Sequence, residues 1–180
     1  MARKRTLVLS ALIAGAALTT SAATAEASPA APQGRPGGGH TTLAITAIGF
    51  GSGPIDVITF EFHTRGAFVA NPLGPGLVVV DAQPNQPFVA TFTTATGDRI
   101  FTQDDPSNPG PPLPTNCPTT GPLASSPYAG GEFITGGTGR YVHATGYIAY
   151  TGCNSVTQDP KSPTGYTFAF TFYDQGTITY

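Results

Sequence analysis

An alternation of hydrophobic and polar side chains with a period of two recurs along the chain beyond its first 40 residues. Every second residue from Tyr166 to Phe172 is aromatic, and the residues between them are Thr or Ala. Ile58, Phe60 and Phe62 alternate in the same way with polar neighbours. Because successive side chains of an extended strand point to opposite faces, this pattern predicts strands with one apolar face.

Similar short runs, rich in Thr, Val, Ile, Phe and Tyr, are separated by Gly, Pro, Asn and Asp, which favour turns. No stretch after residue 40 has a convincing helical period. This pattern predicts an all-β fold, an antiparallel eight-stranded barrel, with a β-sandwich as the alternative. The predicted strands are residues 41–50, 56–64, 76–81, 87–97, 98–103, 131–137, 144–152 and 164–174.

The composition narrows the possible functions. Only 10% of the 180 residues are charged, and the formal net charge is −2. The chain therefore lacks the basic field that drives binding to nucleic acid or to an anionic membrane, and neither partner is expected. The length suits one domain, and 23 Gly with 18 Pro indicate many turns.

The N-terminal segment has the pattern of an export signal. Arg3, Lys4 and Arg5 precede an apolar run at residues 7–18, and small-residue cleavage motifs follow within residues 23–27. The apolar run is shorter than the roughly 20 residues that a membrane-spanning helix needs. We therefore expect residues 1–27 to be a cleaved signal peptide and the protein to be secreted into the extracellular space.

Residues 28–39 are rich in Pro, Gly and Ala, which cannot build a core, and predict a disordered tether. The β-barrel domain is then expected to span residues 40–180. Within it, residues 104–128 contain eight prolines and predict a long loop, because proline donates no hydrogen bond to a strand ladder. Such a loop is either a lid or an inert surface excursion.

The chain contains two cysteines, Cys117 and Cys153, and both follow the predicted signal peptide. In an exported protein we expect them to form a disulfide, two free buried thiols being the alternative. Neither cysteine has a second Cys or a His at the spacing of zinc ligands, and the three histidines share no such spacing either. No metal site is predicted.

The stretch GGEFITGGTGRYVHATGY, residues 130–147, is rich in glycine but fits no phosphate-binding motif. A dinucleotide fingerprint would need a third glycine where Val142 stands, followed by a helix. The simpler interpretation is two strands joined by a tight glycine turn, with Tyr141 folded inward as an anchor.

Residues 134–152, ITGGTGRYVHATGYIAYTG, resemble the Gly-Gly-Thr-Gly-(Arg/Lys)-aromatic, then Ala-x-Gly signature of dirigent proteins and allene oxide cyclases. The resemblance implies an eight-stranded barrel with an apolar central cavity, often trimeric, that steers a reactive small molecule without a cofactor. In these families acidic groups near the first strand serve chemistry, whereas residues 41–50 contain none. No catalytic residue is therefore transferred.

Few residues stand out as candidate site residues. Glu61 and His63 lie two apart on one strand face and are acid/base candidates if that face lines a cavity, although solvent is the favoured surrounding because the other face is apolar. Tyr141 is a third catalytic candidate, and Arg99 and Arg140 are ligand-binding candidates. Three hypotheses follow: a barrel that binds or steers a small hydrophobic molecule, a cofactor-free cyclase or isomerase, and a non-catalytic surface or matrix protein.

Overall fold

The computed structural model describes residues 40–115, 117 and 124–180. The predicted signal peptide and the predicted tether, residues 1–27 and 28–39, lie outside this part of the chain. The described residues contain no helix that is both long and apolar enough to cross a membrane.

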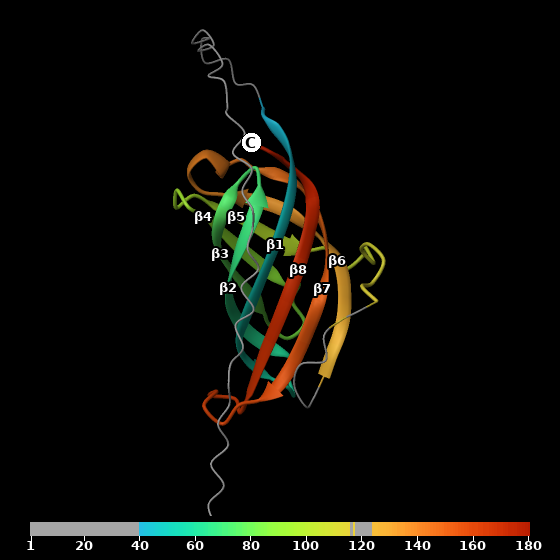
Figure 1. The fold of residues 1–180 in the computed structure, drawn as a ribbon. Helices are drawn as coiled ribbons and strands as arrows, with labels where there is room; N and C mark the ends of the chain where they lie inside the picture. Colours follow the sequence, from blue (N-terminus) through green and yellow to red (C-terminus); the bar gives the residue numbers. More distant parts are fainter. Residues whose placement is uncertain (1–39, 116, 118–123) are drawn as a thin grey trace, which may run out of the picture. The chain divides into compact units, whose positions relative to one another are not determined.

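The described domain is a closed barrel in which each strand pairs antiparallel with its neighbours in sequence and β1 pairs with β8 (Figure 1). The pairing of β1 with β8 leaves one continuous sheet, which confirms the predicted barrel over a two-sheet sandwich. A single 3-10 turn, η1 (Gly139–Tyr141), joins β6 to β7. The strands are β1 (Thr42–Asp56), β2 (Glu61–Asn71), β3 (Gly74–Ala82), β4 (Val89–Thr94), β5 (Arg99–Asp104), β6 (Ala124–Gly137), β7 (Thr145–Gln158) and β8 (Tyr166–Thr179).

The prediction of one strand over residues 56–64 is wrong, because the chain turns at residues 57–60. The Asp56 carboxylate accepts hydrogen bonds from the backbone N–H groups of Ile58 and Thr59, and the Phe60 N–H donates to the Asp56 carbonyl. This local capping of the backbone closes a tight turn. Ile58 and Phe60 are consequently 91% and 52% exposed, and Phe62 alone of the predicted apolar trio is buried.

The proline-rich segment is shorter as a loop than predicted, because β6 already begins at Ala124. Pro127 is part of that strand and lies opposite Cys153 of β7. The strand tolerates this proline because β5 pairs with β6 only from Glu132 onward, so the first half of β6 is a sheet edge. The backbone N–H of Asp105, at the start of the loop, donates to the Gly131 carbonyl and so continues the pairing beyond β5.

Cys117 and Cys153 form the predicted disulfide, with an S–S distance of 2.05 Å and Cα atoms 5.4 Å apart. The bridge joins the proline-rich loop to β7. Cys153 is on the outer face of that strand, since its neighbour Asn154 faces the interior.

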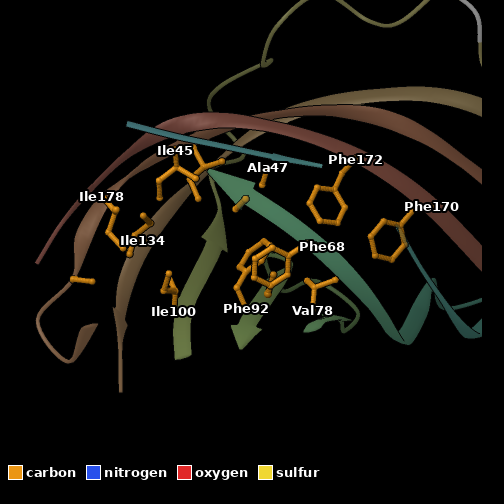
Figure 2. Packing of buried hydrophobic residues seen from close by; sticks show 14 of the residues in the cluster. Ile45, Ala47, Phe68, Val78, Phe92, Ile100, Ile134, Phe170, Phe172 and Ile178 are labelled. Carbon is orange, nitrogen blue, oxygen red and sulfur yellow. The ribbon is translucent and has the colours of Figure 1, made fainter. Parts of the chain in front are cut away.

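The interior differs between the two ends of the barrel. At the end that carries η1, hereafter the η1 end, isoleucines such as Ile45, Ile134 and Ile178 pack closely, as Figure 2 shows. Toward the other end the wall of β8 carries Phe168, Phe170 and Phe172, whose rings stack in sequence with centroids 5.9 and 6.0 Å apart. This half of the barrel, hereafter the cavity end, holds the β1–β2, β3–β4, β5–β6 and β7–β8 connections.

Two glycines of β1 make room for these rings. Gly51 and Gly49 face the interior opposite Phe170 and Phe172, and a Cβ atom on Gly51 would lie 2.6 Å from Cζ of Phe170. Since Cβ atoms do not approach other atoms this closely, the aromatic rings can lie against β1 only because both residues are glycine.

Candidate functional site

A cavity of about 360 Å³ occupies the cavity end of the barrel. Most of its wall is aromatic or aliphatic, and the half-exposed ring of Phe60 with that of Phe88 lies at its rim. Its apolar wall consists of Phe60, Phe62, Val78, Val80, Phe88, Val89, Ala90, Phe92, Ala129, Phe168, Phe170 and Phe172.

Four of the six polar residues that line the cavity form a row across four neighbouring strands. Asp104 of β5 lies directly opposite Glu132 of β6. Tyr150 of β7 lies opposite Gly130 on one side and opposite Asp174 of β8 on the other. The antiparallel register therefore gathers three carboxyl groups and a phenol on one side of the cavity.

Hydrogen bonds hold part of this row in place. The Thr102 hydroxyl donates to Oε2 of Glu132 at 2.6 Å, and the Tyr150 hydroxyl donates to the Asp104 carboxylate at 2.5 Å. The hydroxyl of Tyr128, which also lines the cavity, donates to the Thr171 carbonyl at 2.9 Å. Within the described residues the Asp174 carboxyl has no hydrogen-bond partner.

Glu132 and Asp174 are the buried carboxyl groups of the site, with exposed fractions of 8% and 3%. Burial raises the pKa of Glu132 to about 7, against the opposing effect of the Thr102 hydrogen bond. Burial and the nearby Glu132 raise the pKa of Asp174 well above its ordinary value. Both shifts arise because a low-dielectric surrounding disfavours the charged form, and a second carboxylate disfavours it further. Glu132 therefore titrates near neutral pH, and Asp174 keeps its proton to a higher pH than an ordinary Asp.

Both phenols of the cavity keep their protons over the same pH range. Burial raises the pKa of Tyr128 and of Tyr150, and for Tyr150 the hydrogen bond to Asp104 adds to the effect. The site thus offers proton donors and acceptors to a molecule in the cavity. No group of three His, Cys, Asp or Glu side chains that could hold a metal ion occurs in the described part of the chain.

The structure places the acid/base candidates Glu61 and His63 on the outer surface of β2, away from the cavity. Phe62, between them, points inward, so both neighbours must point outward. The Nδ1 atom of His63 pairs with the Asp81 carboxylate, and Nε of Arg65 donates to Nε2 of His63 at 3.2 Å. These residues form a surface network and do not line the cavity.

The other three candidates lie at the η1 end. Tyr141 is fully buried, as predicted for an anchor, and its ring packs edge-on against Tyr180. Arg140 lies over the Tyr141 ring, 4.9 Å from its centroid, and pairs with Asp98 at 3.4 Å. Arg99 is exposed, and its backbone pairs with Thr138. None of the three lines the cavity.

Sequence reasoning missed the carboxyl groups that do line it, although a signal for each was present. Asp174 continues the inward alternation from Phe168 to Phe172 by one further step. Glu132 has the same parity as Ile134, and a charged residue on an apolar strand face is an indication of a site. The proximity of the two follows only from the strand register, which the sequence does not contain.

The family that the glycine-rich hairpin resembles receives no independent support. Comparison of the chain with protein-family models, with curated proteins and with solved structures found no match.

Proposed function

We propose that this barrel binds, and holds in a defined orientation, a small hydrophobic molecule that carries a polar group. The observation that carries the proposal is the cavity of about 360 Å³. Its volume is within the range of roughly 300–1,000 Å³ of small-molecule sites, which combine apolar walls with a few polar groups. The aromatic wall supplies affinity, and the row from Asp104 to Asp174 selects one orientation.

A filled barrel acting only as a surface or matrix protein fits this interior less well. Such a protein would gain stability by filling the cavity, since voids in a core cost packing energy. Burying Glu132 and Asp174 without ion-pair partners costs further free energy. Binding of a ligand would explain both the unfilled cavity and the buried carboxyl groups.

We also propose that the barrel acts outside the cell after removal of residues 1–27. The disulfide supports this, because such bonds persist in oxidising surroundings. A homotrimer remains a prediction from the family resemblance. The exposed side chains of Ile48, Phe50 and Val69, which neighbour one another across β1 and β2, would favour contact between copies.

Native mass spectrometry of the protein purified from its producer's culture medium tests these proposals together. We expect a chain that begins near residue 28 and carries a non-covalent small molecule. An Ala90→Leu variant should lose that molecule, because the added side chain enters the cavity from β4. The control is Ala149→Leu, which adds the same atoms to the outer face of β7, between the inward Ile148 and Tyr150. Equal ligand loading in both variants, or none in the parent protein, would contradict the proposal.

A cofactor-free isomerase or cyclase is a second candidate function, favoured by the buried Glu132 beside its hydrogen-bond partner Thr102. With a pKa of about 7, Glu132 can both give and take a proton near neutral pH, as general acid/base catalysis requires. If the co-purified molecule is converted by the protein, Glu132→Gln should lower kcat by a factor of roughly 10² to 10⁴. The fold should be retained, since Gln keeps the shape of the protonated side chain. An unchanged kcat would remove Glu132 from the chemistry.

A further inference from the structure

We propose that the ligand of this cavity is a hydrophobic cation, an amine or ammonium compound whose nitrogen lies against Glu132 and Asp174. This inference rests on the proposed function, because it names the chemical class of the bound molecule. Three features of the cavity support this proposal: its ionisable side chains are all acids, one buried carboxyl group has no hydrogen-bond partner, and its wall is aromatic.

The ionisable groups of the cavity are all acids. Asp104, Glu132 and Asp174 line it, and no Lys, Arg or His among the described residues does. A carboxylate on a ligand would face three acidic groups and no cationic side chain at low dielectric, which disfavours fatty acids and other anions. A cationic ligand would instead be attracted by these acidic groups.

Asp174 is the strongest single indication. Its side chain is 3% exposed, faces the cavity and finds no hydrogen-bond partner among the described residues. Glu132 has one partner, Thr102, on Oε2. Buried charges in proteins are normally paired, and an unpaired buried acid is instead held neutral. An ammonium group would supply the missing partner and, with its N–H groups, the missing donors.

The aromatic wall suits the same class of ligand. A cation over the face of an aromatic ring is attracted by the negative potential of that face, more strongly when water is excluded. Phe170 and Phe172 precede Asp174 on the inward face of β8, and Tyr128 and Tyr150 approach from β6 and β7. The hydrocarbon part of the ligand would lie along the phenylalanines, with its nitrogen at the carboxyl row.

Binding of a cation is then linked to release of a proton. The titratable groups that face the nitrogen are Asp104 from β5, Glu132 and Tyr128 from β6, Tyr150 from β7 and Asp174 from β8. An adjacent positive charge favours their ionised forms, so a carboxyl that is protonated in the free protein gives up its proton. Affinity for a permanent cation should therefore rise, by up to tenfold per pH unit, as the pH increases toward 7.

Isothermal titration calorimetry with three probes tests the proposal: 4-phenylbutylamine, 4-phenyl-1-butanol and 4-phenylbutanoate. They share one hydrocarbon part and differ in the charge of the polar end. At pH 7 we expect the amine to bind at least tenfold more tightly than the alcohol, and the carboxylate most weakly. Affinity for the amine should increase between pH 5 and pH 7, and titrations in two buffers of different ionisation enthalpy should reveal proton release.

The variants Glu132→Gln and Asp174→Asn should each reduce the affinity for the amine at least tenfold and leave that for the alcohol within a factor of three. Asp81→Asn, which removes a carboxylate from the outer surface beside His63, is the matched control and should change neither. The titrations in two buffers use the unmodified protein, so they still test the proposal if a variant fails to fold.

The outcomes separate the two proposals. If the alcohol binds as tightly as the amine, or if the carboxylate binds best, the cation proposal is overturned while ligand binding stands. If none of the three probes binds, both proposals fail. Amine binding without proton release would also overturn the role assigned to the protonated carboxyls.

Discussion

The free energy of unfolding of the barrel is expected to decrease as the pH rises from about 4.5 to about 7. The pKa of Glu132 is about 7 in the folded protein against 4.5 for an ordinary Glu, so within this range the folded state binds more protons than the unfolded state. Stability falls with pH wherever the folded state binds more protons. At about 1.4 kcal/mol per pKa unit, Glu132 alone accounts for a loss of about 3 kcal/mol, and Asp174 adds to it in the same direction.

Urea unfolding at intervals of half a pH unit measures this slope. In Glu132→Gln and Asp174→Asn the loss of stability over the range should shrink, because the amide side chains cannot ionise. The lowered pKa values of Asp56, Asp105 and Asp159 act with the opposite sign, but only when the pH falls through and below the ordinary value of 3.8. A stability that is constant or rises between pH 4.5 and 7 would contradict the assignment of Glu132 and Asp174 as buried acids.

Replacing both Cys117 and Cys153 by Ala should lower the free energy of unfolding by roughly 3 to 4 kcal/mol. The bridge closes a loop across a sequence separation of 36 residues, and its removal frees the unfolded chain to adopt many more conformations. The measurement is the urea midpoint at constant slope, compared with that of the parent protein before and after reduction by dithiothreitol.

Reduction should bring the parent protein to the stability of the double variant and leave the double variant unchanged. Since Cys153 is on the outer face of β7, the folded double variant should keep its affinity for cavity probes. A loss below about 1 kcal/mol would mean that the proline-rich loop is already restrained in the unfolded chain.

Much of the barrel could be predicted from local patterns in the sequence. The alternation from Tyr166 to Phe172 predicted β8 and its inward face, because one side of a barrel strand must be apolar. The same rule failed at Ile58 and Phe60, where an alternating stretch is a turn. There the Asp56 carboxylate satisfies the backbone locally, and side-chain hydrophobicity carries no information about that capping.

The site was harder to predict than the fold, because it depends on contacts across strands. Glu132 and Asp174 are 42 positions apart in the chain, and the intervening β7 sets their offset. A sequence fixes which residues point inward along one strand, but the neighbour across the barrel depends on register and on the extra residue that β6 accommodates at Thr135. Glu61 and His63 were predicted as acid/base candidates because they are close in sequence. Closeness in sequence indicates a functional site less reliably than a shared position in a cavity does.

Because Phe170 and Phe172 pack against Gly51 and Gly49, the size of the cavity is sensitive to residues that do not line it. A single methyl group added at Gly51 would displace the Phe170 ring, which lines the cavity, and so change the space available to a ligand. Substitution of Gly49 or Gly51 would thus change the selectivity of the protein without replacing any side chain that lines the cavity.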